Sequence, residues 1–310
     1  MDSRIVRRLV LVLMVVPLLA LSACGSSGGF SGGGGKVVIV GQQFTEADVM
    51  TQMYKQLLDK AGFKTEVKNL GARDVYINPL KKNQVQVSAD YLSSMTEDLN
   101  RRVNGDKAKP VASADQQATL AQLTKLGKKF DMTPLQPAKA QDANAFAVTK
   151  KFAQAHNLKT LSDLGKLGMG IKLAAASDCP TRPDCKVGLQ NKYGIKITGV
   201  EPTGFGTADT KNDLAKGVVQ LGQVGTTDGT LNKLGLVILS DNLHLQNAEN
   251  LVPIVNSTWL AKNPKAKDAL NKLASVLTTA DLTALAVKVD QNREQASKVA
   301  QDYLKQKGLI

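Results

Sequence analysis

His156 and His244 are the only histidines in the 310 residues, so the side chain that most often serves as a general base is scarce. No H-E-x-x-H motif or Walker A loop occurs, and GFGTAD at 204–209 is not the dinucleotide-binding fingerprint. Carboxylates are abundant but show no catalytic spacing. The sequence therefore favours a protein that binds a ligand, with no cofactor and no metal, over an enzyme held in the cell envelope, which is the alternative.

Cys24 stands between an apolar run and a Gly/Ser-rich stretch. Three arginines in residues 1–8 precede LVLVLMVVPLLAL at 9–21, a pattern typical of a secretory signal and shorter than the roughly 20 residues of a membrane span. The tetrapeptide LSAC at 21–24 resembles the bacterial lipobox, in which cleavage leaves a lipidated cysteine. We expect residues 1–23 to be a signal peptide, Cys24 to carry a lipid anchor on the outer face of the cell membrane, and residues 24–35 to be a flexible linker. An ordinary secretory signal with an incidental cysteine is the alternative.

Cys179 and Cys185 are the other two cysteines, and they lie close together in DCPTRPDC at 178–185. Exported proteins meet an oxidising environment, in which an even pair of cysteines favours a disulfide. A metal site would need further ligands, and neither histidine lies near this segment in the sequence. We therefore expect a disulfide that constrains a small loop.

Lysine and arginine number 40 against 27 acidic residues, which gives a net charge of +13. A basic excess can indicate nucleic-acid binding. Here the basic residues are scattered, no block of five like charges occurs, and aromatic residues that could stack on bases make up 4% of the chain. We expect no nucleic-acid partner and interpret the charge as a solvated basic surface that faces an anionic envelope.

Strand and helix patterns alternate from residue 36 onward. Short runs rich in β-branched residues predict strands at 36–41, 64–70 and 85–89, with helices between them at 45–61 and 72–82. Thr45-Glu46-Ala47-Asp48 resembles a capping box at the first helix start. This order is typical of a parallel α/β sheet. An amphipathic helix at 113–126, with Gly127 as its stop, follows.

The same alternation restarts in a second unit after residue 142. The predicted elements are strands at 143–149, 169–175, 195–200 and 218–224 and helices at 160–167, 187–193 and 209–217. After the apolar run LGLVIL at 234–239, another strand at 250–256 leads to three helices at 265–277, 279–289 and 293–308. Because this helical tail has no sheet of its own, we expect it to pack on the first unit.

These elements predict an α/β fold of two lobes joined by two crossings. Lobe I is expected to comprise residues 36–140 and 247–310, and lobe II residues 141–246. Ligands of open α/β sheets bind beyond the carboxyl ends of strands, so we expect a ligand cleft between the lobes that closes by hinge motion.

Seven segments, taken in order, resemble those of one protein family. They are VGQQFTEADVM at 40–50, VSADYLSSM at 87–95, NAFAVTK at 144–150, CPTRPDCKVGLQNKYGI at 179–195, TTDG at 226–229, NLVPIVN at 250–256 and LTTADLTALAVKVD at 277–290. The family is that of the substrate-binding proteins of glycine betaine/choline/proline betaine ABC importers. The resemblance implies a type II periplasmic-binding-protein fold that delivers a small-molecule ligand to a membrane permease with an ATPase subunit. We expect the protein to be a monomer.

The family's site combines aromatic rings around a quaternary ammonium with donors for a carboxylate, and the resemblance assigns these roles residue by residue. Tyr91 matches a cage tyrosine and Ser94 a threonine, Gln42 stands where betaine binders often have lysine, and Asp142 matches an acidic residue before the crossover strand. Arg182, on the cysteine-closed loop, is positioned to grip a carboxylate. The complete expected set is Gln42, Gln43, Phe44, Tyr91, Ser94, Asp142, Asn144, Arg182, Thr226 and Asp228.

Three positions at which the family commonly has a cage tyrosine are occupied here by Asn144, about Lys211, and Gly225. Phe44 and Phe205 are candidate replacements for these rings, although phenylalanines in such turns more often make core or hinge contacts. The resemblance implies a betaine- or choline-like compatible solute. Because these cage rings are missing, a different small polar or zwitterionic ligand is the alternative.

Overall fold

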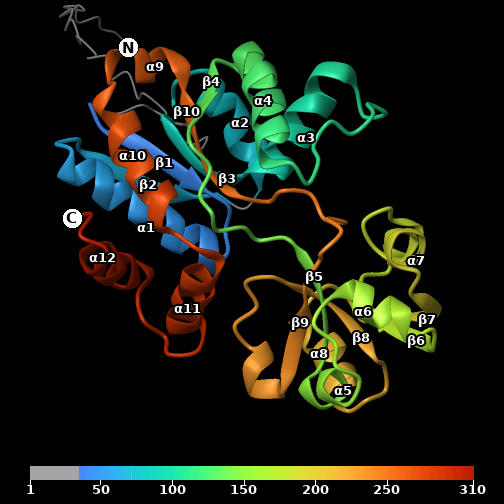
Figure 1. The fold of residues 1–310 in the computed structure, drawn as a ribbon. Helices are drawn as coiled ribbons and strands as arrows, with labels where there is room; N and C mark the ends of the chain where they lie inside the picture. Colours follow the sequence, from blue (N-terminus) through green and yellow to red (C-terminus); the bar gives the residue numbers. More distant parts are fainter. Residues whose placement is uncertain (1–34, 71) are drawn as a thin grey trace, which may run out of the picture. The chain divides into compact units, whose positions relative to one another are not determined.

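The computed structural model of the chain describes residues 35–70 and 72–310 (Figure 1). The predicted signal peptide 1–23, Cys24 and all but residue 35 of the predicted linker lie outside this range. None of the helices in the described ranges combines the length and the apolar character needed to cross a bilayer. Within the same ranges, no three His, Cys, Asp or Glu side chains gather in a way that could hold a metal ion.

The first sheet has the strand order β2-β1-β3-β10-β4. β1 pairs in parallel with β2 and β3, whereas β10 runs antiparallel to both β3 and β4. β1 and β10 are buried along their whole length, which explains why VVIVG and LVPIVN are almost uninterrupted apolar runs. The strand bounds are Val37–Gly41 (β1), Thr65–Asn69 (β2), Val87–Tyr91 (β3), Met132–Pro134 (β4) and Leu251–Asn256 (β10).

Helix α1 packs against the C-terminal helices of the chain. Its buried Met53 and Leu57 share one hydrophobic core with Leu285 and Val299 of the tail, and α10, α11 and α12 all contact α1 (Figure 1). The prediction that the helical tail packs on the first unit is therefore confirmed. The helices around this sheet are Thr45–Lys60 (α1), Arg73–Lys81 (α2), Leu92–Asn104 (α3), Gln116–Gly127 (α4), Ser257–Lys262 (α9), Lys265–Val276 (α10), Thr279–Asp290 (α11) and Ala296–Gln306 (α12), with a 3-10 turn at Lys128–Phe130.

The second sheet has the order β7-β6-β8-β5-β9. β6 pairs in parallel with β7 and β8, whereas β5 runs antiparallel to β8 and β9. Its strands are Asn144–Thr149 (β5), Gly170–Ala174 (β6), Lys196–Glu201 (β7), Leu221–Gly225 (β8) and Leu236–Leu239 (β9). Its helices are Lys150–Ala155 (α5), Leu161–Lys166 (α6), Lys186–Tyr193 (α7) and Ala208–Ala215 (α8), with 3-10 turns at Cys179–Thr181 and Leu231–Leu234.

The sequence-based prediction missed the short elements α5, α9 and β4 and the longer helix α3. Helix α3 is polar overall, but Leu92, Met95 and Leu99 recur on one face and are fully buried. The strand predicted at 85–89 is displaced by two residues, so that β3 ends on Asp90 and Tyr91. Both sheets are mixed, whereas the alternation of strands and helices predicts parallel sheets. β10 in the first sheet and β5 in the second run antiparallel to their neighbours.

The predicted capping box at Thr45 is wrong. Phe44 is the N-cap of α1 and makes no side-chain capping bond, while Thr45 Oγ1 donates to Asp290 Oδ1 of α11 at 2.5 Å. A capping box does occur at α6, where Thr160 and Asp163 bond reciprocally. Gly127, expected as a stop after α4, is instead its last residue.

Two stretches of chain connect the sheets, and they are hydrogen-bonded to each other. Gln141 and Asn250 form an isolated antiparallel bridge, the Asp142 N–H donates to the Glu249 carbonyl at 3.0 Å, and the Leu251 N–H donates to the Ala140 carbonyl at 3.0 Å. The two crossings therefore form a short double-stranded connection.

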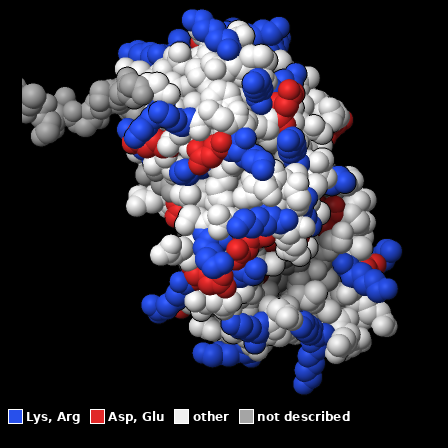
Figure 2. All heavy atoms as spheres, turned by 90° about the vertical axis from the view of Figure 1, so that its left-hand side faces the viewer, with Lys and Arg blue, Asp and Glu red and all other residues white. Residues whose placement is uncertain are grey.

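Lysine and arginine are dispersed over the face shown in Figure 2, with aspartate and glutamate between them. No continuous basic surface forms on this face. The arrangement fits the interpretation of the net charge as a solvated basic surface.

Candidate ligand-binding site

Side chains from both sheets and both crossings line one cavity of about 410 Å³. Gln42 follows β1 and Tyr91 ends β3, so the cavity lies beyond the carboxyl ends of two parallel strands. The lining residues are Gln42, Phe44, Arg73, Tyr91, Ser94, Asp142, Ala143, Asn144, Arg182, Asp184, Phe205, Gln246, Asn247 and Glu249.

Seven of the ten residues expected from the sequence line this cavity: Gln42, Phe44, Tyr91, Ser94, Asp142, Asn144 and Arg182. The other three do not. Gln43 is exposed. Thr226 accepts a hydrogen bond from the Ala143 N–H and donates to the Gln141 carbonyl, both at 3.0 Å, and Asp228 pairs with Lys211 Nζ at 2.9 Å. These contacts connect Thr226 to a crossing and Asp228 to α8.

Tyr91 is 7% exposed and contacts residues of the α1 start. Its hydroxyl donates to Glu46 Oε1 at 2.5 Å, and its ring stacks on Phe44 with centroids 6.1 Å apart. Burial raises the pKa of Glu46 to about 8, and the charge of Asp142 acts in the same direction, while hydrogen bonds from Tyr91 and Thr227 oppose the shift. Tyr91 therefore separates the cavity from a buried carboxyl group.

Asp142 and Glu249 lie on opposite crossings, and each is held by a hydroxyl group. Thr227 Oγ1 donates to Asp142 Oδ1 at 2.9 Å, and Ser94 donates to Glu249 from Oγ at 2.7 Å and from its N–H at 3.1 Å. Burial raises the pKa of Asp142 and raises that of Glu249 to about 7. The Ser94 hydroxyl, which the sequence assigned to the ligand, is thus bound to Glu249.

Arg73 is a lining residue that the sequence analysis missed. Its Nε lies 3.1 and 3.0 Å from the two Asp90 oxygens and its Nη2 lies 2.6 Å from Oδ1, while the Tyr76 hydroxyl donates to Asp90 Oδ2 at 2.6 Å. Asp90 is fully buried in β3. An aspartate in an otherwise buried strand needs a partner, and this was the available signal for a nearby cation.

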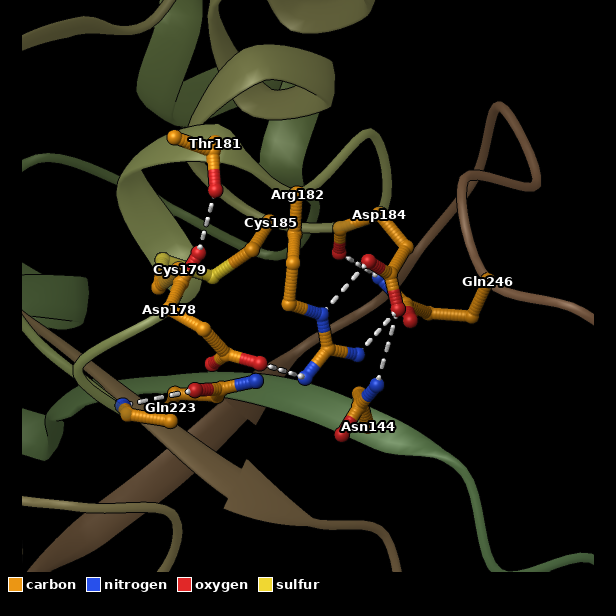
Figure 3. The surroundings of a disulfide bond; sticks show 10 residues. Asn144, Asp178, Cys179, Thr181, Arg182, Asp184, Cys185, Gln223 and Gln246 are labelled. Carbon is orange, nitrogen blue, oxygen red and sulfur yellow. Dashed lines mark hydrogen bonds and ion pairs between the residues drawn. A yellow bond between two sulfur atoms is a disulfide. The ribbon is translucent and has the colours of Figure 1, made fainter. Parts of the chain in front are cut away.

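Arg182 lies on the loop closed by the Cys179–Cys185 disulfide, whose Cα atoms are 5.2 Å apart (Figure 3). Figure 3 shows its guanidinium turned toward Asp184, with Nε to Oδ1 at 2.9 Å and a second contact from Nη2 to Oδ2. Asn144 Nδ2 also donates to Asp184 Oδ2 at 3.2 Å, and Gln246 Nε2 donates to the Asp184 carbonyl at 2.8 Å. The arginine expected to grip a ligand carboxylate is therefore paired with a carboxylate of the protein.

Three aromatic rings line the cavity, those of Phe44, Tyr91 and Phe205. Phe44 is 40% and Phe205 is 47% exposed, so neither is a core residue. A Cβ atom placed on Gly225 would lie 3.6 Å from Phe205 Cζ. The Phe205 ring therefore stands beside a position where the family resemblance expects a tyrosine.

Residues 35–306 match the OpuAC family, the substrate-binding domain of ABC-type glycine betaine transport systems. The glycine betaine-binding protein YehZ of Escherichia coli (strain K12) is 30% identical over 182 residues, which span 56% of this chain and 60% of YehZ. The carnitine transport binding protein OpuCC of Listeria monocytogenes is 24% identical over 300 residues, 94% of each protein.

Solved structures of similar proteins share the fold. Apo YehZ from Escherichia coli superposes with a TM-score of 0.75 at 24% identity, covering 89% of this chain and all of YehZ. The crystal structure of a glycine betaine/carnitine/choline ABC transporter protein gives a TM-score of 0.76 at 22% identity, covering 88% of this chain and 99% of the other. These likenesses confirm the two-lobed α/β fold, and the family match over most of the sequence shows that the chain belongs to the OpuAC family of substrate-binding domains.

Proposed function

We propose that this protein is the extracytoplasmic solute-binding subunit of an ABC importer and that it captures a small quaternary ammonium solute of the glycine betaine, carnitine or choline kind. Lobe I, residues 36–140 and 247–310, and lobe II, residues 141–246, close around the solute, and the closed form is presented to the permease. A solute drives closure only through its preference for the closed state. The protein acts as a monomer.

The observation that carries the proposal is the convergence of residues far apart in the sequence on one cavity. Gln42 and Tyr91 come from the first sheet, Asn144 from the second, and Asp142 and Glu249 from the two crossings. A molecule in the cavity would contact both halves and the connection between them. Such contacts give a solute a differential effect on hinge closure.

Phe44, Tyr91 and Phe205 supply the faces for a quaternary ammonium. Each desolvated ring contributes up to roughly 2 kcal/mol through cation–π attraction, so three rings support a moderate affinity and the polar lining supplies the remainder. The protein makes and breaks no covalent bond in its ligand.

The N-terminal segment completes the proposal. Residues 1–23 direct export, Cys24 is lipidated, and residues 24–35 tether the binding domain to the outer face of the membrane. In this oxidising compartment the Cys179–Cys185 disulfide is stable.

Calorimetric titration of the purified full-length chain with glycine betaine, carnitine and choline tests the ligand class, with glycine and glucose as control solutes. At least one quaternary ammonium solute should bind and should raise the Tm by mass action. Phe205→Ala should weaken binding about tenfold, the effect of removing one ring. Val218→Ala is the matched control, since Val218 is 53% exposed and does not line the cavity. Binding of another zwitterion alone would favour the alternative ligand class.

A further inference from the structure

We propose that, within the ligand class just proposed, the cavity prefers a solute with a net positive charge and no carboxylate, such as choline, over a zwitterion such as glycine betaine. This inference rests on the proposed function and concerns the charges that surround the same cavity.

Both guanidinium groups at the cavity are already committed to carboxylates of the protein. Arg73 contacts both oxygens of Asp90, which is fully buried, and Arg182 contacts both oxygens of Asp184. The remaining polar residue near the β1 end, Gln42, is neutral. These pairs use Nε and Nη2 of each guanidinium and balance its positive charge with a carboxylate of the protein. A ligand carboxylate that reached the remaining N–H groups would therefore meet an arginine whose charge is already neutralised, and taking Arg73 away from Asp90 would leave a buried charge unpaired, which is costly.

Three further carboxyl groups have no cation of their own. In the described parts of the chain, no lysine or arginine lies within ion-pair distance of Glu46, Asp142 or Glu249. Arg73 acts on Glu249 only at longer range. Asp142 and Glu249 line the cavity, whereas Glu46 is 5% exposed and lies behind Tyr91. The cavity therefore has an acidic balance that its own arginines do not neutralise.

This excess of acidic groups favours a cationic solute and disfavours a zwitterionic one. A cation is attracted to Asp142 and Glu249 while its methyl groups contact the rings of Phe44 and Phe205. A zwitterion gains the same attraction but also brings a carboxylate into a half-buried site that is already lined by two carboxyl groups without an ion-pair partner, Asp142 and Glu249. Like charges in such a site repel strongly, so the site discriminates by excluding the second charge.

The protonation state of each of these carboxyl groups depends on the groups that face it. Glu249 faces Ser94, Arg73 and Asp90, Asp142 faces Thr227 and Asp228, and Glu46 faces Tyr91, Thr227 and Asp142. Burial raises the pKa of Glu249 to about 7, so it is partly protonated near neutrality. A bound cation favours the ionised form, and binding should therefore release protons.

Titration calorimetry of the full-length chain at pH 8 with choline and glycine betaine tests the preference without any mutation. Choline should bind at least about tenfold more tightly, the order expected for removing one repulsive charge at an effective dielectric near 20. Choline binding should strengthen between pH 6 and pH 8. Titrations in buffers of different ionisation enthalpy should show proton release.

The variants Asp142→Asn and Glu249→Gln remove one charge each with little change in shape. Each should weaken choline binding about tenfold and narrow the gap to glycine betaine. Asp106→Asn is the matched control, because Asp106 is exposed and does not line the cavity. Circular dichroism confirms that each variant is folded.

Glycine betaine binding as tightly as choline, or charge-neutral variants that bind choline like the native chain, would overturn this inference and leave the proposed function standing. Binding of neither solute, nor of carnitine, would contradict the proposed function itself. The two failures are therefore distinguishable in one set of titrations.

Discussion

Tyr91 at the end of β3 donates a 2.5 Å hydrogen bond to Glu46 in the first turn of α1. The tyrosine ring faces the cavity and the glutamate lies behind it, 5% exposed. The Tyr91 side chain thus both lines the cavity and donates a hydrogen bond to a buried carboxyl group.

The two roles of Tyr91 separate by mutation. Tyr91→Phe keeps the ring and removes the donor, so we expect ligand affinity to change by less than about threefold while the free energy of unfolding falls by about 1–3 kcal/mol. Tyr91→Leu removes the ring as well, and ligand affinity should fall a further tenfold or so. Calorimetric titration and urea denaturation of both variants measure the two effects. Equal affinity losses in the two variants would contradict the separation.

Glu46 should make the protein less stable as the pH rises. Its pKa is raised from 4.5 to about 8 by burial, so the folded state binds the proton more tightly than the unfolded state. The stabilisation from that proton is fully present below about pH 4.5 and is lost as the pH rises toward 8. Glu249, with a pKa of about 7, adds to the slope.

Glu46→Gln removes the titrating group and keeps an oxygen that can accept from Tyr91. We expect the variant to exceed the native chain in unfolding free energy by about 1–3 kcal/mol at pH 8 and to lose this advantage near pH 5. Urea denaturation across this range measures the slope, with Asp106→Asn as the control. An unchanged slope in Glu46→Gln would show that Glu46 is not its source.

The disulfide closes a short ring between residues six positions apart. Replacing both Cys179 and Cys185 by serine should lower the unfolding free energy by about 2 kcal/mol, because the loop-entropy gain of so short a ring is small. Reductant should bring the native chain to the same stability and should leave the variant unchanged. A reductant-insensitive native chain would contradict this expectation.

Gly229, in the loop after β8, lies against α11. A Cβ atom at this position would approach Val287 Cγ2 to 2.1 Å, and Gln291 Nε2 donates to the Gly229 carbonyl at 3.4 Å. Gly229→Ala should therefore cost about 1–3 kcal/mol through overpacking. Val287→Ala should relieve much of that cost, and a double-mutant cycle should give a coupling of about 1 kcal/mol or more. Additive effects would show that the two residues do not interact.

Cys24→Ser tests the proposed lipid anchor. In cells fractionated after lysis, the native chain should sediment with membranes and label with a fatty-acid analogue, whereas the variant should do neither. Ser22→Ala is the control, because this substitution leaves the cysteine in place. Membrane association of the cysteine variant would show that Cys24 is not the anchor. A native chain that neither sediments with membranes nor takes up the label would support the alternative, an ordinary secretory signal with an incidental cysteine.

The alternation of strands and helices was readable because it depends on local periodicity, and the resulting fold class is confirmed. The positions of Gln42, Tyr91 and Asn144 at the cavity were expected from the family resemblance, and Gln42 and Tyr91 also follow predicted strands, at 36–41 and 85–89. The antiparallel direction of β10 was not predictable from local periodicity, because it depends on the path by which the chain comes back to the first sheet.

The residues that the sequence analysis missed share a different cause. Arg73 and Glu249 belong to no catalytic or binding motif, and they meet only because α2 and the second crossing converge beside β3. The pairing of Arg182 was likewise hidden, because DCPTRPDC contains an aspartate on either side of the arginine. In the folded loop Arg182 contacts both, Asp184 at 2.5 Å and Asp178 at the longer distance of 3.8 Å.

Asp142 and Glu249 belong to backbone segments that are hydrogen-bonded to each other where the chain passes between the sheets. A substitution of Asp142 or Glu249 that adapts the cavity to another solute therefore also changes the connection that we propose as the hinge. At these two positions, evolution of the ligand preference and evolution of the closing motion are expected to be coupled.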